Sequence, residues 1–448
     1  MSEAALLWTA AGALVAAIVV PYVLRHRHRR AHDRERKQEA QALGIDRPTA
    51  QYPLIDPLHC IGCGACVAAC PEGDVLGIVG GTATVINGLR CVGHGRCETA
   101  CPVSAIQVGL GDLRGRDDVP RLDPFGESGV PGLFVVGEAG GLALVRNAIE
   151  QGRKAVEQIA ERLPPRPKHD EAVDVLIVGA GPSGLSAALA AVERNLRHRV
   201  IEQEETLGGS LLHYPRRKLV LIQPVDVPLH GRLNRNEYSK EDFLVLMEGL
   251  VGEHALDVRF GERVIAVHRV GSAFEVETTH GRHAARAVLL APGRRGTPRK
   301  LGAPGEDLPK VMYRLLDAES YRGQHILVVG GGDSAVEAAI GLARQPDNVV
   351  TLSYRRDKLV RIKKKNDERF APLLRSGAIR ARFGSQVKEI RKDAVTLAVG
   401  PETVELRNDY VFVFAGGEPP YAFLRAAGVS FGGPPVAPAK PGMALTVS

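Results

Sequence analysis

Cysteine is missing from most of this chain, because all seven of its cysteines lie between Cys60 and Cys101 and none follows. A set that is odd in number and clustered argues against a secreted disulfide scaffold and indicates a reducing compartment. Nor can the chain beyond Cys101 carry a redox-active dithiol. Aromatic residues are also scarce, at 5% of the sequence, which disfavours nucleic-acid binding by base stacking.

Positive charge is concentrated in one short segment. The net charge is +7, and residues 25–37 hold seven Arg or Lys and two acidic residues, so +5 of it lies there. The remainder is nearly neutral, and we expect no nucleic-acid partner. With 448 residues, 44% hydrophobic and 24% charged, the chain is long enough for two to four folded domains.

Residues 4–24 form a charge-free stretch of 21 residues, long enough to cross the hydrocarbon core of a bilayer as a helix. Glu3 precedes it and arginines follow it, which is the reverse of a secretory signal. By the positive-inside rule, the chain after Arg25 lies in the cytoplasm. The sequence therefore predicts a single-pass anchor of the bacterial inner membrane at 1–25 and a basic juxtamembrane linker at 26–54. A buried core helix is the alternative.

Two cysteine runs follow, both based on the spacing C-x2-C-x2-C-x3-C-P of bacterial iron–sulfur proteins. The first run is complete, whereas a histidine replaces the second cysteine of the other. Their residues are Cys60, Cys63, Cys66 and Cys70, then Cys91, His94, Cys97 and Cys101. A zinc site and free thiols are the disfavoured alternatives. Residues 77–88, between the runs, alternate as in a β-hairpin.

These runs resemble those of two-cluster ferredoxins, which implies a small α+β ferredoxin-like domain at 55–111. By that resemblance one [4Fe–4S] cluster would be held by Cys60, Cys63, Cys66 and Cys101. The other would be held by Cys70, Cys91 and Cys97. Either His94 ligates its fourth iron, or that iron is absent and the cluster is [3Fe–4S]. An imidazole in place of a thiolate removes negative charge and raises the reduction potential.

A first dinucleotide-binding signature begins at residues 173–178, a largely apolar run typical of a buried parallel strand. Gly179, Gly181 and Gly184 follow in the spacing G-x-G-x-x-G, and Glu202 ends the next strand-like run. The glycines allow a tight turn, close approach of a pyrophosphate and close helix packing, while the acid binds ribose hydroxyls. The pattern predicts a Rossmann-like unit.

A second signature begins with the strand-like run 324–329. Its glycine loop contains Gly330, Gly332 and Ala335. The following strand-like run ends in Arg355 and Arg356, where an NAD site would carry an acid. Paired guanidinium groups suit a 2′-phosphate, which favours NADP(H), and a solvated loop is the alternative.

Both signatures, with further stretches at 288–306 and 411–429, resemble the thioredoxin-reductase-like family of two-domain flavoproteins. The resemblance implies an α/β fold with two Rossmann-like domains, FAD on the first and NADP(H) on the second. The two stretches would be the crossovers between these domains. The loop 206–229, including Gly209, would frame the isoalloxazine ring. Relatives of this type are often homodimers, so a homodimer is expected by resemblance.

The family's last FAD motif stands before the first glycine loop instead of after the return crossover. Gly137 and Glu138 follow a strand-like run there and precede a helix-like segment at 143–163. We interpret this order as a circular permutation, with amides after Gly137 facing the pyrophosphate and Glu138 binding the ribityl chain. An accidental strand–helix pair is the alternative. The predicted domains are then 112–163 and 172–297 for FAD, 298–415 for NADP, and 416–448 for the return crossover and tail.

These parts together predict an electron-transfer enzyme. Nicotinamide delivers two electrons as a hydride, each cluster accepts one, and flavin converts between the two. Ser183 stands where a single-cysteine relative of the bacillithiol-disulfide-reductase type carries its cysteine, so disulfide substrates are disfavoured. No acid–base or nucleophilic residue is required, and none is assigned.

We therefore predict a membrane-anchored oxidoreductase that passes electrons between NADPH, FAD and two iron–sulfur clusters. Its partner would be an unidentified redox protein or quinone-linked complex at the membrane. One alternative is an NADPH-dependent flavin reductase of a small molecule, with the clusters as accessory electron inputs. The other is a redox-sensing subunit, which the intact NADP motif disfavours because a sensor needs no hydride donor.

Overall fold

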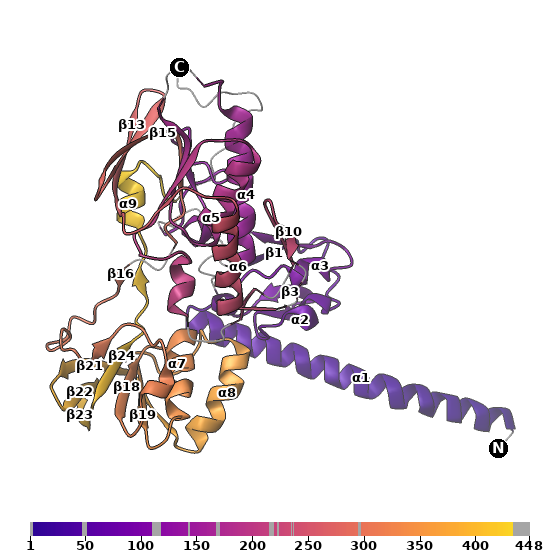
Figure 1. Cartoon of the computed structure of the whole chain (residues 1–448). Coiled ribbons are helices and arrows are strands. Elements are labelled where there is room, and N and C mark those ends of the chain that lie inside the picture. The colour runs from indigo at the N-terminus through magenta and orange to yellow at the C-terminus, as the bar shows by residue number, and fades with distance from the viewer. Residues whose placement is uncertain are drawn as a thin grey trace. The chain divides into compact units, whose positions relative to one another are not determined.

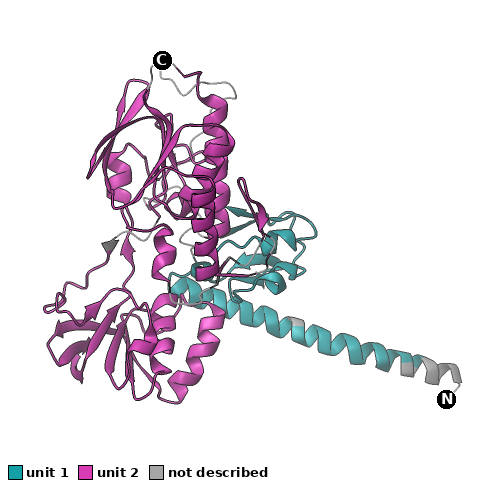
Figure 2. Ribbon diagram, viewed as in Figure 1, with its two compact units in different colours: residues 1–111 teal, residues 112–448 magenta. Residues whose placement is uncertain are grey.

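The computed structural model is shown in Figure 1. It describes residues 3–46, 52–109, 118–141, 144–166, 171–214, 219–221, 224–233, 235, 237–293 and 297–432. The chain divides into two compact units, Met1–Gly111 and Asp112–Ser448 (Figure 2). Both cysteine runs lie in the first unit, and both glycine-rich signatures lie in the second.

The first unit holds a small α+β fold built around the two cysteine runs. Its strands form two antiparallel pairs, β1 with β4 and β2 with β3, and the second pair is the predicted hairpin. Cys66, Leu76, Ala83 and Ile106 belong to its buried core. The described elements of this unit are α1 (Glu3–Ala42), β1 (Tyr52–Ile55), α2 (Ala65–Ala69), β2 (Leu76–Val79), β3 (Thr82–Val85), η1 (Gly88–Arg90), α3 (Arg96–Thr99) and β4 (Ile106–Gly109).

The helix α1 continues through the charged segment without interruption and ends at Ala42. Its second half is tied to the rest of the first unit. Asp33 Oδ2 accepts a hydrogen bond of 2.8 Å from the Ile78 amide on β2, and Arg36 pairs with Asp74 at 2.9 Å. The segment expected to be a linker after residue 25 is therefore helical as far as Ala42.

The predicted membrane anchor at 1–25 is wrong. Within the described part of the chain, no helix combines the length and the apolar character that crossing a bilayer requires. The apolar stretch is the first part of a longer helix, and the second part of that helix is charged and bonded to the hairpin of the same unit. The inner-membrane localisation inferred from the anchor is wrong for the same reason.

The second unit contains two α/β domains, and the first of them is organised on a seven-stranded sheet. The strand order is β12-β7-β6-β15-β14-β13, with β5 also paired to β15. The strands β12, β7, β6, β15 and β5 run parallel, while β14 and β13 are antiparallel. The elements are β5 (Leu133–Val135), η2 (Gly137–Gly140), α4 (Val145–Arg162), β6 (Val173–Val178), α5 (Pro182–Glu193), β7 (His198–Ile201), η3 (Gly209–His213), α6 (Lys240–Glu253), β12 (Val258–Arg259), β13 (Val264–Val270), β14 (Ala273–Thr278) and β15 (Gly281–Leu290). Short strands β8 (Leu219–Leu221), β9 (Val225–Val227), β10 (Gly231–Leu233) and β11 (Tyr238–Ser239) lie between η3 and α6.

The strand β5 and the helix α4 belong to this domain although they precede β6 in the chain. Leu133 to Val135 on β5 pair in parallel with Val288 to Leu290 on β15. The helix α4 packs along α5, and the Ser186 hydroxyl on α5 donates a hydrogen bond of 2.8 Å to the Ile149 carbonyl on α4. Phe134, Ile149, Val156 and Ile159 are buried in the same core as Val175 and Ile177 of β6. Figure 1 shows α4 and α5 side by side.

The join between α4 and β6 is held by a buried carboxylate. Asp174 on β6 pairs with Arg166 from the connecting segment and with Arg286 from β15, and its side chain is 8% exposed. Burial by itself raises the pKa of Asp174, but hydrogen bonds from the Arg197 amide and from the two arginines outweigh it and lower the pKa. Residues 167–170 of the predicted linker 163–172 lie outside the described residues.

Asp174→Asn is expected to destabilise the second unit by roughly 3 kcal/mol, because the change leaves partly buried arginines without their counter-charge. Because the pKa of Asp174 is lowered in the folded protein, its stabilisation is fully present at pH values above 3.8, the ordinary pKa of this group. The stabilisation is lost as the pH falls through the lowered pKa. Urea unfolding of both proteins at neutral and acid pH measures the difference. Asp307→Asn, at a side chain that is 94% exposed, is the control and should cost at most about 1 kcal/mol. Equal effects of the two substitutions would contradict the assigned role of Asp174.

The second α/β domain has a five-stranded parallel sheet in the order β17-β24-β18-β19-β20, beside a three-stranded antiparallel sheet, β21-β22-β23. The two crossover segments meet where β16 pairs with β25, through Thr297 with Glu418. The elements are β16 (Thr297–Pro298), β17 (Val311–Met312), η4 (Ala318–Ser320), β18 (His325–Val329), α7 (Asp333–Ala343), β19 (Val349–Tyr354), α8 (Lys364–Arg375), β20 (Ile379–Phe383), β21 (Ser385–Ile390), β22 (Ala394–Val399), β23 (Glu402–Arg407), β24 (Tyr410–Val413) and β25 (Gly417–Glu418). The helix α9 (Tyr421–Ala426) follows β25, and its Leu424 is buried in the core of the first α/β domain with Leu133 and Val135.

Candidate functional site

The first glycine loop joins β6 to α5, and two of its glycines are required by packing. Gly179 has φ of 107°, and a Cβ added there would lie 2.4 Å from the Ala291 carbonyl oxygen. A Cβ on Gly184 would lie 1.8 Å from the carbonyl oxygen of Gly179. Gly181, in contrast, has nothing within 4 Å of its Cβ position. The loop is therefore closed towards the protein and open at Gly181, as a pyrophosphate site requires.

Two buried polar groups border this loop. Glu202 directly follows β7, and its carboxylate accepts hydrogen bonds of 2.6 Å from the Ala180 amide and 3.0 Å from the Glu204 amide. Burial raises its pKa. The Ser183 hydroxyl lies in the first turn of α5 and is buried without a hydrogen-bond partner. A buried donor at a helix amino terminus fits the phosphate of a dinucleotide.

Segments from three parts of the chain converge at this loop. A Cβ on Gly137 would lie 3.2 Å from Cβ of Ser183, and the Gly137 amide donates a hydrogen bond of 2.7 Å to Gln151 Oε1. A Cβ on Gly209 would lie 3.4 Å from Cα of Gly181. Glu138 is exposed. In the loop 206–229, residues 215–218 and 222–223 lie outside the described residues.

The second glycine loop joins β18 to α7. Gly330 has φ of 145°, and a Cβ there would lie 3.0 Å from Cβ of the buried Ala335, whereas Gly332 has open space. Arg355 and Arg356 come directly after β19, with Arg355 exposed and Arg356 half-buried. The sequence did not single out Tyr354, whose ring would be 2.2 Å from a Cβ on Gly331. Its only signal is its place as the last residue of β19.

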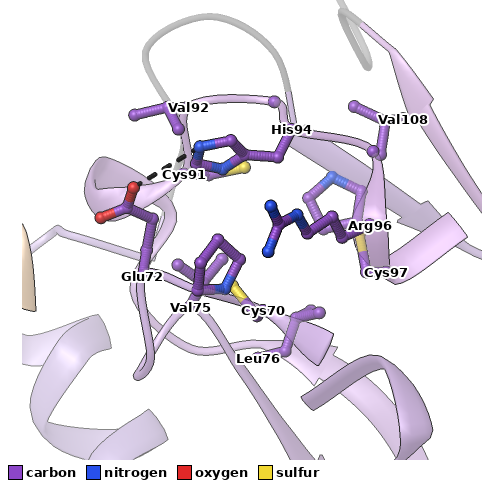
Figure 3. Close-up of a pocket in the computed structure, with 14 residues that line it drawn as sticks. Cys70, Glu72, Val75, Leu76, Cys91, Val92, His94, Arg96, Cys97 and Val108 are labelled. Atoms are coloured by element: carbon purple, nitrogen blue, oxygen red, sulfur yellow. Dashed lines mark ion pairs between the residues drawn. The ribbon is translucent and has the colours of Figure 1, made fainter. Parts of the chain in front are cut away.

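The cysteines of the first unit line two separate hollows. One has an empty volume of about 270 Å³, and the other, of about 340 Å³, is drawn in Figure 3. The smaller is lined by Cys60, Cys63, Cys66 and Cys101. The larger is lined by Cys70, Cys91, Cys97 and His94. Among the described residues, no group of three or more His, Cys, Asp or Glu side chains is arranged to hold a single metal ion.

Backbone geometry shapes the cysteine loops. The Ala83 amide donates to Cys60 Sγ over 3.3 Å, and the Ala105 amide donates to Cys101 Sγ over 3.2 Å. Gly62 has φ of 65°, and a Cβ there would lie 2.0 Å from a carbonyl oxygen of the hairpin. Amide donors to sulfur tune iron–sulfur clusters, so these loops fit such a group.

Four cysteine thiols in these hollows have a raised pKa. Burial raises the pKa of Cys66 and of Cys97 to about 11, and it raises the pKa of Cys70 and Cys91. Iron binds the thiolate, so loading either hollow with a cluster must release protons.

The larger hollow is also lined by a carboxylate that the sequence did not indicate. Glu72 Oε1 lies 3.7 Å from His94 Nε2, and the two side chains are 12% and 10% exposed. Figure 3 shows the pair on one side of the hollow, with the ring of His94 next to Cys91. The available signal was the position of Glu72 two residues after Cys70.

Known proteins match both units. Residues 52–102 match the family of 4Fe-4S dicluster domains. Residues 176–434 match the family described as pyridine nucleotide-disulphide oxidoreductase. The fold and these matches define an FAD- and NAD(P)-dependent oxidoreductase with a 4Fe–4S dicluster domain, an enzyme of electron transfer. In particular, the chain belongs to the pyridine nucleotide-disulphide oxidoreductase family.

Several relatives share the second unit. A bacilliredoxin reductase of Bacillus subtilis is 29% identical over 57% of this chain and 80% of its own length. A ferredoxin–NADP reductase of Ignicoccus hospitalis is 31% identical over 58% of this chain and 82% of its own length. The structure of a bacillithiol disulfide reductase from Staphylococcus aureus has a TM-score of 0.53 at 30% identity, covering 58% of this chain and 81% of that one.

Proposed function

We propose that this enzyme passes electrons between NADPH, FAD and two iron–sulfur clusters, to or from a separate redox protein. The observation that carries the proposal is the presence, in one chain, of a dinucleotide-binding pair of domains and of two cysteine-lined hollows. When bound, FAD converts between the electron pair of a hydride and the single electrons that clusters carry. A relative named ferredoxin–NADP reductase supports the combination of NADP(H) chemistry with an iron–sulfur electron carrier.

The flavin would be held by residues around the first glycine loop. Gly179, Gly181 and Gly184 shape the loop, the Ser183 hydroxyl would bind the pyrophosphate, and the Glu202 carboxylate would bind ribose hydroxyls. We place Gly137, Glu138 and Gly209 at the same cofactor. Their support is the approach of Gly137 to Ser183 and of Gly209 to Gly181.

We also propose that the flavin domain is circularly permuted. The parallel pairing of β5 with β15 and the packing of α4 on α5 support this, because β5 belongs to the same sheet as β6 and α4 packs on the helix that follows β6. The family match begins only at residue 176, after this segment. Arg166, which follows α4, and Arg286 on β15 both form ion pairs with Asp174 on β6, and these pairs stabilise the connection between the two segments of the flavin domain.

For the clusters, we propose one [4Fe–4S] centre on the four cysteines of the smaller hollow and a second centre in the larger. The second would be held by Cys70, Cys91 and Cys97, with His94 on its fourth iron. The largely buried position of the His94 side chain among the three cysteines supports this assignment over a three-iron cluster.

The test is an anaerobic titration of the full chain with NADPH and then NADH, recording flavin absorbance and low-temperature EPR together. We expect NADPH to bleach the flavin and to produce reduced-cluster signals. Bleached flavin with oxidised clusters would contradict the proposed electron path. That outcome would favour a reductase that acts on a small molecule at the flavin.

Replacing Arg355 and Arg356 by alanine is expected to raise KM for NADPH by roughly 10- to 100-fold per arginine, because each hydrogen bond to a charged group contributes about 1.5–3 kcal/mol. KM for NADH should change little, since NADH has no 2′-phosphate. Steady-state kinetics with both nucleotides measures the difference between the change in KM for NADPH and the change in KM for NADH. Arg407→Ala, at an exposed residue on β23 of the same domain, is the control. Parallel losses with NADPH and NADH would contradict a 2′-phosphate site.

A further inference from the structure

The hairpin of β2 and β3 connects α1 to the smaller hollow. Ile78 and Ala83 lie directly opposite each other in this hairpin, and both line the hollow. In an antiparallel ladder, opposite residues alternate between pairs that exchange hydrogen bonds and pairs that exchange none. Both amides of this pair bond outside the hairpin. The Ile78 amide donates to Asp33 Oδ2 over 2.8 Å, and the Ala83 amide donates to Cys60 Sγ over 3.3 Å.

The Asp33 side chain fits closely against β2. It is 15% exposed, and its Oδ1 atom accepts a hydrogen bond of 3.2 Å from Arg36. A Cβ added to Gly77, the neighbour of Ile78 on β2, would lie 2.9 Å from the carboxylate carbon of Asp33. The carboxylate therefore lies against the backbone of the strand, at a position where glycine leaves room for it.

The end of the same helix is fixed at a second place. The Ile45 carbonyl, just beyond α1, accepts a hydrogen bond of 3.0 Å from the Gly88 amide, and Ala40 and Ile45 are buried. Because these contacts do not involve Asp33, a substitution of Asp33 should release β2 without detaching α1. The match to 4Fe-4S dicluster domains covers residues 52–102, so α1 lies outside the matched domain.

We propose that Asp33 is a positioning residue for the iron–sulfur cluster of the smaller hollow. By holding β2 at Ile78, it keeps the opposite Ala83 amide on Cys60 Sγ. The role rests on the proposed function, in which Cys60 is a ligand of the first [4Fe–4S] centre. A hydrogen bond to a ligand sulfur stabilises the reduced, more negative cluster and so raises its reduction potential. A residue of α1 thus tunes the potential of the first cluster.

The test compares two variants of the full chain that carry the same net charge. Asp33→Asn keeps a carbonyl oxygen that can accept from the Ile78 amide, whereas Asp33→Ala removes the acceptor. A dithionite titration followed by EPR measures the potential of each cluster. We expect a lower potential for the first cluster in Asp33→Ala than in Asp33→Asn, and the same potential for the second cluster in both. Equal potentials of the first cluster, or equal shifts of both clusters, would overturn the inference.

Iron release to a chelator is the second measurement. Losing a partner outside the ligand set usually weakens metal retention by about 10- to 100-fold, so the first cluster of Asp33→Ala should lose iron about 10-fold faster than that of Asp33→Asn. The second cluster belongs to the same unit and reports any general loss of folding. Release that is faster to the same extent for both clusters would contradict a positioning role.

A matched control lies two residues further along α1. Glu35 is exposed, and Glu35→Ala removes one negative charge from the same helix. It should leave both potentials and the iron release unchanged, and a change equal to that of Asp33→Ala would count against the inference. Dithionite reduces the clusters without NADPH, so failure of the proposed electron path is observed separately. Absence of the first cluster from the unsubstituted protein would overturn the cluster assignment and the role of Asp33 with it.

Discussion

Gly152→Val is expected to remove the flavin from this protein. Gly152 lies on α4 where that helix meets α5, and a Cβ at this position would be 2.1 Å from the Ser183 carbonyl oxygen and 3.1 Å from the Ala187 amide. Both contacts are with the backbone of α5, so no side chain can move aside. The first turn of α5 carries the glycine loop and the Ser183 hydroxyl, and displacing it disrupts the proposed pyrophosphate site.

The expected result has two parts. Overpacking of this kind costs about 1–3 kcal/mol of stability, and flavin content after gel filtration should fall from about one per chain to a small fraction. The flavin-to-protein absorbance ratio and a thermal unfolding curve measure the two effects. Both the flavin content and the thermal stability can be measured without knowing the physiological electron acceptor.

The control for this substitution is a glycine in a different helix of the same domain. Gly249 on α6 is exposed and has nothing within 4 Å of its Cβ position. Gly249→Ala should keep the flavin and stabilise the protein by up to about 1 kcal/mol, since glycine is a poor helix former. Full flavin occupancy in Gly152→Val would mean that α4 is not packed against the flavin site, and the proposed permutation would fail.

Cys101→Ser is expected to remove the proposed cluster of the smaller hollow and to slow electron transfer to a one-electron acceptor. Cys101 belongs to the second run but lines the smaller hollow with three cysteines of the first run. Losing one thiolate ligand should weaken retention of that cluster by at least about 100-fold, since even outer partners of metal ligands are worth about 10- to 100-fold. Reduction of a one-electron acceptor should fall accordingly, while NADPH should still bleach the flavin.

Iron content, EPR and stopped-flow absorbance of the flavin measure these three quantities in one preparation. Thr99→Ala is the control, because Thr99 lies in the same segment and is exposed, and its hydroxyl donates a hydrogen bond to the Gly95 carbonyl. A Cys101→Ser protein with a full complement of iron and normal acceptor reduction would contradict the cluster assignment.

Local sequence patterns predicted those strands whose burial follows a simple pattern along the chain. The strand β6 spans the residues 173–178 that its largely apolar run indicated, because a strand buried on both faces is apolar at nearly every position, here all but Asp174. The hairpin of β2 and β3 was equally readable from alternation and a Gly-Gly turn. The strand-like run predicted to end in Arg355 and Arg356 is shorter in the structure, because β19 ends at the buried Tyr354 directly before the two arginines.

The same local reasoning was wrong for the first helix. An uncharged stretch of this length is typical of a membrane-spanning helix, but the stretch here belongs to a longer helix. That helix continues to Ala42, and Asp33 on it bonds to an amide of β2. A hydrogen bond between residues 45 positions apart leaves no mark in the pattern of either segment.

The amino-acid sequence alone predicted the classes of cofactor (flavin, nicotinamide dinucleotide and iron–sulfur cluster), because cysteine spacing, glycine spacing and terminal strand charges are local properties of the chain. Only the tertiary structure decided how the distant parts combine. It paired β5 with β15, set Gly152 against α5, and brought Glu72 to His94. These contacts depend on packing between segments that are far apart in the chain, and such packing becomes visible only when the fold brings them together.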